Sequence, residues 1–354
     1  MQIKVLHAKN KKTKPADSDL GFGKVFTDHM FTMDYSAKKG WHNPLIKPFE
    51  DFIISPAAMI FHYGQAIFEG LKAYSGPNDK IHLFRPKENM KRMNRSAKGI
   101  CIPTFDEDFV LDAMKQLILL EKKWVPKTFG TSLYIRPTII AVDPFLGLRA
   151  SLTYKFFIIL SCVGAYYSSG LNPIKIWVSK DHVRSIRGGT GEFKTAGNYA
   201  ASLIASEKAI KEGYAQVLWL DAIKRKYIEE VGAMNIFFLI GDELITPYLS
   251  GSILHGITRD SVITLAKEWG MKVVQRQISI NEIFEAFEKN QLKEIFGTGT
   301  AAVISPVGEI KYGDRILKIA DNKAGKTSMK FYNALTDIQY NKTHDTQNWV
   351  EIID

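Results

Sequence analysis

One lysine stands inside a glycine-rich segment, and its chemistry gives the first candidate for a function. Residues 188–199 read Gly-Gly-Thr-Gly-Glu-Phe-Lys-Thr-Ala-Gly-Asn-Tyr, so Lys194 follows three glycines and precedes a fourth. Glycine allows a positive φ and the close approach of other groups, so such a loop can hold one long side chain inward. A lysine that is buried in this way is a nucleophile toward carbonyl carbons. Taken alone, a lysine in a loop is more often a solvated surface charge, and the rest of the chain has to decide.

Four other stretches could complete a pyridoxal phosphate site, which needs an acid for the pyridine nitrogen, donors for the phosphate and a face for the substrate. Glu229-Glu230 precede a predicted strand, and an ionised carboxylate there could keep the pyridine nitrogen protonated. Gly256-Ile257-Thr258 begin a predicted helix, whose free N–H groups suit a phosphate, and Arg92 could add a forked contact. The turn over residues 297–302 could present N–H groups to a carboxylate. Each stretch also has an ordinary structural explanation, so these residues predict an anion-binding lysine site and no more.

The elements that must position these groups mix strands and helices from the start of the chain. Hydrophobic periodicity in the first half predicts strands over 25–35, 81–84, 132–140 and 154–160, and helices over 86–98 and 106–124. Pro86 suits the first position of its helix. Trp41-His42-Asn43-Pro44 predicts a turn.

The second half of the chain follows a segment, residues 164–173, that is rich in Gly, Ser, Asn and Pro. Gly241-Asp242 between two apolar runs predicts a hairpin of strands 235–240 and 243–246. Further strands are predicted over 174–178, 216–220 and 272–277, and helices over 198–211, 257–269 and 280–290. We therefore expect an α/β fold with mixed elements in two domains: a small N-terminal domain over 1–163, a linker over 164–173 and a large C-terminal domain over 174–354.

Composition narrows the class of protein. The chain has 354 residues, of which 45% are hydrophobic, so it can bury a large core. The net charge of +10 could indicate nucleic acid, but Lys and Arg are spread along the chain and no nucleic-acid module is recognisable, so anionic small molecules fit better. The chain has only two cysteines, Cys101 and Cys162, no signal-peptide pattern and no apolar run that could span a bilayer. We expect a reduced, cytosolic, soluble protein with no membrane or nucleic-acid partner.

Four segments together resemble the branched-chain amino acid aminotransferases, and they stand in the order found in that family. They are Gln65–Ala73, Glu230–Asn235, Gly297–Ala301 and the lysine loop, and the resemblance runs from about residue 23 to about residue 335. It implies a two-domain, D-amino acid aminotransferase-like arrangement, the fold type IV of pyridoxal phosphate enzymes. It also implies pyridoxal 5'-phosphate as cofactor, no metal ion, and a homodimer with the active site near the subunit interface.

The resemblance implies roles at the cofactor. Lys194 is similar to the lysine that forms the imine with pyridoxal phosphate, and Glu230 to the partner of the pyridine nitrogen. Tyr199 matches the tyrosine that contacts the phenolic oxygen. The phosphate is expected to contact Arg92, Ile257, Thr258 and Thr300.

The resemblance also implies roles at the substrate. Thr300 and Ala301 resemble the turn that takes the substrate carboxylate. Arg136 resembles the arginine that receives the second carboxylate of glutamate. The walls of the side-chain pocket are expected to be Tyr63, Phe68, Tyr134 and Tyr166.

The implied activity is the transamination of leucine, isoleucine and valine with 2-oxoglutarate. Two positions depart from the family pattern. Ala302 and Ser305 stand where mammalian members carry a Cys-x-x-Cys pair, and Ala233 stands where many members have threonine, which puts the hydrogen bonds to the substrate carboxylate in doubt. Two alternatives stay open: another fold type IV enzyme, either a D-amino acid aminotransferase or an aminodeoxychorismate lyase, and a basic nucleic-acid-binding protein.

Overall fold

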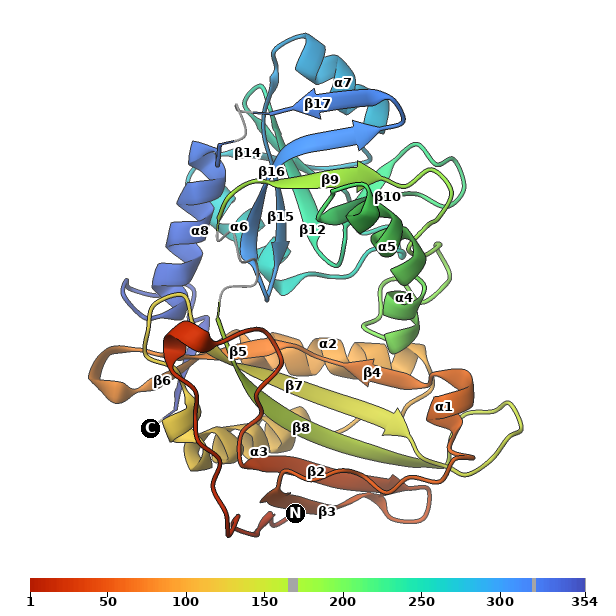
Figure 1. The fold of residues 1–354 in the computed structure, drawn as a ribbon, viewed down its shortest axis with the longest axis vertical. Coiled ribbons are helices and arrows are strands. Elements are labelled where there is room, and N and C mark those ends of the chain that lie inside the picture. Colours follow the sequence, from red (N-terminus) through yellow and green to blue (C-terminus); the bar gives the residue numbers. More distant parts are fainter. Residues whose placement is uncertain (165–170, 320–322, 354) are drawn as a thin grey trace. The chain divides into compact units, whose positions relative to one another are not determined.

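The computed structural model describes residues 1–164, 171–319 and 323–353, and the chain forms two compact units (Figure 1). The first unit comprises Met1–Tyr166, Phe193–Gly197 and Asp337–Asp354. The second comprises Tyr167–Glu192 and Asn198–Thr336. Residues 165–170 of the predicted linker, Tyr166 among them, lie outside the described residues. The domain division made from the sequence stays a prediction.

The first unit is built on a nine-stranded sheet, counted over the described residues, in the order β1-β3-β2-β8-β7-β5-β6-β18 with β4 paired to β7. The long central strands alternate buried and less buried residues, because successive side chains point to opposite faces. The strands are β1 (Lys4–Val5), β2 (His29–Ser36), β3 (Gly40–Pro48), β4 (Ala66–Phe68), β5 (Leu71–Ser75), β6 (Ile81–Phe84), β7 (Ser132–Ala141), β8 (Thr153–Val163) and β18 (Val350–Ile353).

Two helices pack against this sheet and close its core, α2 (Pro86–Gly99) and α3 (Glu107–Leu120). Both confirm the sequence-based predictions. Pro86 occupies the first turn of α2, and the side chain of Asp106 caps α3 by accepting the N–H of Phe109 at 3.0 Å. Between the sheet and these helices lie buried methionine, aliphatic and aromatic side chains, including those of Met90, Met114 and Phe156. These side chains form the hydrophobic core of the first unit.

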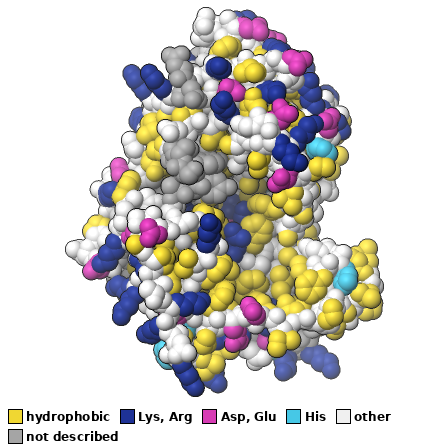
Figure 2. All heavy atoms as spheres, in the orientation of Figure 1, with side chains coloured by type: hydrophobic (Ala, Val, Ile, Leu, Met, Phe, Trp, Pro, Cys, Tyr) yellow, Lys and Arg dark blue, Asp and Glu magenta, His cyan; other side chains and the backbone are white. Residues whose placement is uncertain are grey.

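Apolar side chains are exposed on the first unit around α1 (Met59–Tyr63) and the segment that follows β7 (Figure 2). Phe61 is 62% exposed, and Leu146 and Leu148 are exposed to 63% and 83%. The two stretches lie together, because Met59 N–H donates to the carbonyl of Asp143 at 3.0 Å. An exposed apolar patch of this kind often marks an interaction surface.

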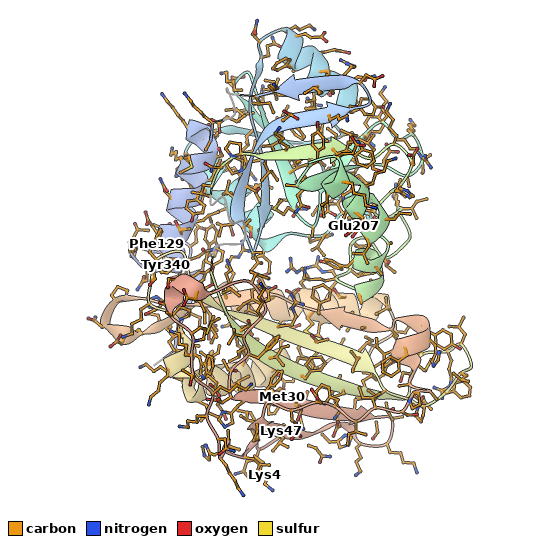
Figure 3. The ribbon with its side chains drawn as sticks, viewed as in Figure 1. Lys4, Met30, Lys47, Phe129, Glu207 and Tyr340 are labelled. Carbon is orange, nitrogen blue, oxygen red and sulfur yellow. The ribbon has the colours of Figure 1, made fainter. Side chains whose placement is uncertain are left out.

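The turn predicted over Trp41–Pro44 is wrong, because these residues belong to β3. This strand pairs antiparallel with β2, where Met30 is the partner of Lys47, both of them labelled in Figure 3. Asn43 has a left-handed φ of 53°, and the pairing shifts register beside it. The turn-forming residues therefore make a β-bulge within a strand, a place where proline is tolerated.

The second unit holds a further nine-stranded sheet, again counted over the described residues, in the order β11-β10-β9-β16-β15-β12-β13-β14 with β17 paired to β16. The predicted hairpin is confirmed: Ile240 pairs with Glu243 across Gly241, whose φ is 59°. The strands are β9 (Ile174–Val178), β10 (Gln216–Leu220), β11 (Ile228–Val231), β12 (Asn235–Ile240), β13 (Glu243–Thr246), β14 (Lys272–Gln275), β15 (Leu292–Gly299), β16 (Val303–Tyr312) and β17 (Arg315–Lys318).

Helices that contact strands of the second sheet include α5 (Leu203–Lys211), α6 (Ile257–Glu268) and α7 (Ile280–Glu288). The helix predicted over 198–211 is in fact broken into α4 (Ala196–Ala200) and α5. The break lies at residues 201–202, where Ser202 N–H and Oγ both bond to the carbonyl of Tyr199, a tighter turn than an α-helix makes. Helices α6 and α7 agree with the prediction. None of the helices in the described ranges is both long and apolar enough to cross a membrane.

The chain passes between the two units four times. The first return is short, since only Phe193–Gly197 rejoin the first unit before the chain leaves again. The last return uses α8 (Lys326–Gln339) and brings the chain to β18. Within the first unit the Tyr340 ring lies 5.0 Å from that of Phe129 (Figure 3), and its hydroxyl donates to the carbonyl of Thr131 at 2.6 Å. The fold therefore confirms the predicted mixed α/β class. Each of its two units is built from segments that are not consecutive in the sequence.

Candidate functional site

Lys194 lies on the short segment that returns to the first unit, where hydrogen bonds from both sides fix its backbone. Its N–H donates to Ser96 Oγ at 2.9 Å, and its carbonyl accepts the N–H of Phe68 at 3.1 Å. The next residue, Thr195, donates its hydroxyl to the carbonyl of Ala66 at 2.8 Å. The lysine is thus fastened between α2 and β4. A loop held this firmly can aim a long side chain in one direction.

The ammonium group of Lys194 lies in a partly buried environment that is both aromatic and charged. Its Nζ is 4.9 Å from the centre of the Phe68 ring. Glu69 is fully buried nearby; burial disfavours its charged form, yet the Arg92 guanidinium and the Lys194 ammonium hold the pKa of this carboxyl below its ordinary range. The lysine is therefore half-buried beside a buried ion pair, and is not a fully exposed surface charge.

Arg92 and Glu69 form a two-pronged ion pair in the interior of the first unit. Arg92 Nε donates to Glu69 Oε1 at 2.7 Å, and the NH2 group donates to Oε2 at 2.8 Å. Asn89 and the N–H of Gly70 donate to the same Oε2, at 2.8 and 3.1 Å. Sequence analysis singled out Arg92 but gave Glu69 no role. Glu69 follows β4 and Arg92 lies in α2, 23 residues further along the chain, so no local sequence pattern predicts the pairing.

Arg136 and Tyr134 lie on one face of β7, as alternate residues of a strand do. The Arg136 guanidinium carbon is 4.8 Å from the Phe68 ring centre and 5.2 Å from the Tyr134 ring centre. The NH2 group of Arg136 donates to the Tyr134 hydroxyl at 3.1 Å. Its Nε is buried without a hydrogen-bond partner among the described residues. This guanidinium has donor capacity left for an incoming anion. Tyr63 is more exposed, and its hydroxyl donates to the carbonyl of Leu146.

A buried cation that sequence analysis passed over lies beside this face. Lys72 on β5 is the register partner of Tyr134 and is only 8% exposed. Burial disfavours the ammonium form and lowers the pKa of Lys72 to about 8. Lysine in a strand otherwise looks like a solvent-facing residue, so the sequence holds no signal for this burial.

Glu230, in the second unit, is a buried carboxylate with fixed partners. Arg184 Nε lies 2.5 Å from its Oε2, and Asn235 donates to its Oε1 at 3.1 Å. Arg184 is itself fixed, because its NH2 group donates to the carbonyls of Gly191 and Ser252 at 2.8 and 2.6 Å. Sequence analysis found Glu230 and assigned no role to Arg184 or Asn235. Arg184 precedes the lysine by ten residues, outside the glycine-rich pattern that drew attention.

A cavity of about 110 Å³ opens beside Glu230 within the second unit. Arg184, Tyr199 and Ala233 lie on its walls together with Glu230. It combines a carboxylate, a phenol and a guanidinium in a space that Trp219 and Leu254 also line. Such a cavity suits the edge of a polar, planar ring that offers a protonated nitrogen and an oxygen.

Helix α6 begins at Ile257 in the second unit, and Gly256 is its N-cap without a side-chain cap. The first N–H groups of a helix have no partner within the helix, so they attract anions. A Cβ at Gly256 would lie only 1.9 Å from Asn235 Oδ1, so a larger residue there would displace the Asn235 side chain. Thr258, in the first turn, is buried. The helix start is thus packed against the same Asn235 that holds Glu230.

The glycine-rich segment 297–302 is the end of β15 and the turn that joins it to β16. Gly299 pairs with Val303, and Thr300 and Ala301 form the turn itself, half-buried. Thr298 Oγ1 is buried without a hydrogen-bond partner among the described residues. The structure therefore gathers the predicted residues into two sets. In the first unit they are Tyr63, Phe68, Arg92, Tyr134, Arg136 and Lys194; in the second they are Tyr199, Glu230, Ile257, Thr258, Thr300 and Ala301.

Known proteins share this fold and sequence over nearly the whole chain. The family model of class IV aminotransferases matches residues 66–310. Branched-chain-amino-acid aminotransferase 2 of Bacillus subtilis (strain 168) is 54% identical over 98% of this chain and 96% of its own. The branched-chain-amino-acid aminotransferase of Mycolicibacterium smegmatis is 44% identical over 93% and 91%. A solved branched-chain amino acid aminotransferase from Escherichia coli has a TM-score of 0.74 and 26% identity, covering 92% of this chain and 98% of its own.

The match to the family model covers well over half of the chain. The chain therefore belongs to the class IV aminotransferases and, among them, to the branched-chain amino acid aminotransferases. The resemblance first drawn from four short segments is confirmed, and so is the fold type IV arrangement that it implied.

Proposed function

We propose that this protein uses pyridoxal 5'-phosphate to transfer the amino group of leucine, isoleucine or valine to 2-oxoglutarate. The observation that carries the proposal is the 54% identity over nearly the full length to a branched-chain aminotransferase, combined with a lysine fastened on both sides of its backbone. When bound, pyridoxal phosphate supplies an aldehyde that accepts amino groups and a ring that withdraws electrons from the substrate's α-carbon.

Lys194 is the proposed base of the reaction. Its Nζ removes the proton from the α-carbon of the amino acid and returns it later in the transfer. Support comes from the fixed backbone of the segment and from the aromatic wall of Phe68, which keeps water from one side of the ammonium group. The fixed orientation matters because a base acts only within hydrogen-bonding reach of the proton.

Glu230 is the proposed partner of the pyridine nitrogen. A carboxylate in this role keeps the ring protonated and so maintains its electron-withdrawing power. The pairing with Arg184 and Asn235 supports this role, since both fix the direction of the carboxylate in a buried place. Tyr199 is the proposed partner of the phenolic oxygen, in keeping with its place on the cavity beside Glu230.

The phosphate is proposed to lie at the start of α6, with contacts from Ile257, Thr258, Thr300 and Arg92. The glycine N-cap, which provides no side-chain cap, supports an anion at this end of the helix. Arg92 would keep Glu69 as one partner while it also contacts the phosphate, an arrangement that a guanidinium with five N–H donors allows.

The substrate is proposed to be held by separate groups for its carboxylates and its side chain. The turn N–H groups at Thr300 and Ala301 take the α-carboxylate, and Arg136 takes the second carboxylate of glutamate. The spare donor capacity of Arg136 supports this assignment. Apolar side chains are proposed to lie against Tyr63, Phe68, Tyr134 and Tyr166.

A cytoplasmic homodimer is the proposed assembly. The exposed apolar residues around α1 support a partner surface on the first unit. On the face drawn in Figure 2, Lys and Arg are scattered among acidic and neutral residues and are not gathered into one stripe. Such scattering favours small anionic substrates over a nucleic acid.

The visible spectrum of the purified protein with pyridoxal phosphate tests the proposed function. L-Leucine should change the cofactor absorbance, and 2-oxoglutarate should restore it with formation of glutamate. D-Alanine is the comparison substrate, because turnover of D-alanine without turnover of L-leucine would indicate a D-amino acid aminotransferase. Absence of any cofactor absorbance would overturn the proposal.

A further inference from the structure

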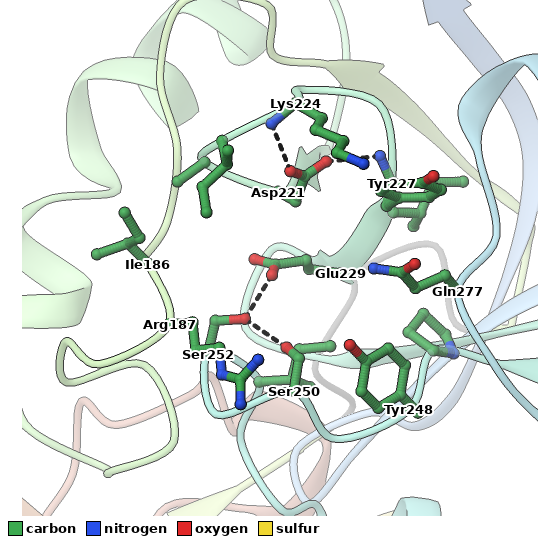
Figure 4. A pocket seen from close by; sticks show the side chains of 15 residues that line it. Ile186, Arg187, Asp221, Lys224, Tyr227, Glu229, Tyr248, Ser250, Ser252 and Gln277 are labelled. Carbon is green, nitrogen blue, oxygen red and sulfur yellow. Dashed lines mark hydrogen bonds between the residues drawn. The ribbon is translucent and has the colours of Figure 1, made fainter.

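A second cavity, of about 190 Å³, lies within the second unit (Figure 4). It forms where the turn between β10 and β11 meets the segment that follows β13. Its walls are largely apolar and aromatic, from Ile186, Ile223, Tyr227, Tyr248 and Ile253. Ile228, Glu229 and Ser252 also line it. None of its lining residues lines the cavity beside Glu230. It is a separate space that the proposed transamination does not use.

Glu229 forms the polar floor of this cavity. It is 7% exposed, its Oε1 accepts the hydroxyl of Ser252, and its Oε2 is buried without a partner in the described part of the chain. Burial raises the pKa of the Glu229 carboxyl. A buried carboxylate with one unused oxygen is costly unless something donates to it. Glu229 therefore has one position open for a donor.

Asp221, the other acid on the wall, is already occupied. Its two oxygens accept the backbone N–H groups of Lys224, Lys226 and Tyr227, at 2.7, 2.9 and 2.7 Å. Figure 4 shows Asp221 beside Lys224 and Tyr227. These bonds outweigh burial and hold the pKa of Asp221 below its ordinary range. Asp221 shapes the turn between β10 and β11, so the recognition of a ligand falls to Glu229.

Glu229 and Glu230 are consecutive residues of β11, and consecutive side chains of a strand point to opposite faces. This alternation explains why Glu230 borders one cavity and Glu229 the other. The arrangement also means that Glu229 has no place in the proposed chemistry at Glu230. A buried acid in a strand core is nevertheless an unusual choice, since buried acids are rare unless they are paired.

The size of the cavity limits the ligand. An apolar cavity of about 150 Å³ holds one benzene ring, so about 190 Å³ holds about six to eight non-hydrogen atoms. The walls require an apolar body, and the floor requires a hydrogen-bond donor. A cation satisfies the floor better than a hydroxyl group, because a charge-assisted bond is roughly twice as strong as a neutral one.

We propose that this cavity is a second ligand site, which binds a small primary ammonium ion with a branched or straight apolar chain through Glu229. The ammonium group donates to Glu229 Oε2, and the chain lies against the isoleucine and tyrosine walls. Arg187 and Lys224 also line the cavity.

The probe for the test is 3-methylbutylamine, which has six non-hydrogen atoms. Binding is followed by saturation-transfer NMR on the holoenzyme after borohydride reduction, which prevents the probe from reacting with a cofactor aldehyde. We expect saturable binding that weakens at least about tenfold in Glu229→Gln. The neutral analogue 3-methylbutan-1-ol should bind the unchanged protein at least about tenfold more weakly than the amine.

Glu207→Gln is the matched control, because it makes the same substitution at an exposed residue of α5 that does not line the cavity. Glu207 is labelled in Figure 3. The control variant should bind the probe as the unchanged protein does. Ser250→Leu fills the cavity without removing the charge and should abolish binding, which keeps the proposal testable if Glu229→Gln fails to fold. Equal affinity in Glu229→Gln and the unchanged protein, undiminished binding in Ser250→Leu, or no saturable binding at all would overturn the proposal. The measurement does not depend on turnover, so its failure is distinct from failure of the proposed function.

Discussion

Replacing Glu69 by glutamine tests how much the buried ion pair of the first unit contributes to stability. Glu69 is fully buried and receives two bonds from Arg92, one from Asn89 and one from the N–H of Gly70. Glutamine keeps the shape, but its NH2 group would face these donors, and Arg92 would be left as a buried cation without its charge partner. Breaking a buried pair from one side costs about 3–5 kcal/mol, and we expect Glu69→Gln to lose that much free energy of unfolding.

Urea unfolding of the cofactor-free protein at pH 7 measures this loss without any contribution from ligand binding. Because the pKa of Glu69 is held below its ordinary range, its stabilising effect is present above that range and is lost as the pH falls through the lowered value. The difference between Glu69→Gln and the unchanged protein should therefore shrink in acid. Replacing both partners, as Glu69→Leu with Arg92→Met, should recover most of the loss. Glu207→Gln, on the surface, should change the free energy of unfolding by less than about 0.5 kcal/mol.

The reasoning would be refuted by a loss below about 1 kcal/mol in Glu69→Gln, since a surface ion pair accounts for that much. It would also be refuted if the double variant were as unstable as the sum of the two single ones, because the partners would then act independently.

Three further predictions concern other cationic residues: Lys194, Arg136 and Lys72. Lys194→Ala should abolish transamination in a folded protein. In the unchanged protein, peptide mapping after borohydride reduction should find the cofactor label on Lys194 alone; a label elsewhere contradicts the assignment. Arg136→Met should slow the single-turnover reaction of glutamate at least about thirtyfold more than that of leucine, since losing a buried charge partner costs about 2 kcal/mol or more; equal losses would make Arg136 a residue that only shapes the pocket. Because the pKa of Lys72 falls from 10.5 to about 8 on folding, the unfolded state binds more protons between these values, and the free energy of unfolding should rise with pH across that window. Urea curves at pH 8 and 10 should show this rise in the unchanged protein and not in Lys72→Met; the same rise in both would exclude Lys72 as its source.

Local signals in the sequence predicted most of the elements correctly. Pro86 and Asp106 correctly predicted the starts of two helices, and Gly241-Asp242 predicted the hairpin. Helix capping and turn formation depend on residues only a few positions apart, so the sequence shows them directly. The same locality explains the errors. Asn43 and Pro44 carry the signature of a turn, and only pairing with β2 makes them part of a bulged strand.

The candidate site was predictable where it rests on short motifs and not where it rests on distant pairings. Lys194 and Glu230 each stand in a recognisable segment. Glu69 pairs with Arg92, 23 residues away, and Arg184 pairs with Glu230, 46 residues further along the chain. A short motif does not reveal pairings at such separations. Burial of Lys72 and Glu229 likewise depends on which face of a strand is covered, and one sequence does not give that.

The interlaced course of the chain limits how the protein can be cut. A fragment that ends at Tyr166 carries the first sheet nearly whole, with Glu69 and Arg92, but it lacks both β18 and the lysine-bearing residues Phe193–Gly197. No single break in the chain yields the two units as separate pieces, because the chain crosses between them four times. Genetic dissection into halves would therefore give the first half its structural frame without Lys194, the proposed base. A split version would need the lysine segment supplied in trans by the second fragment. If Lys194 holds pyridoxal phosphate as proposed, the absorbance of the cofactor would report the reassembly of the fragments.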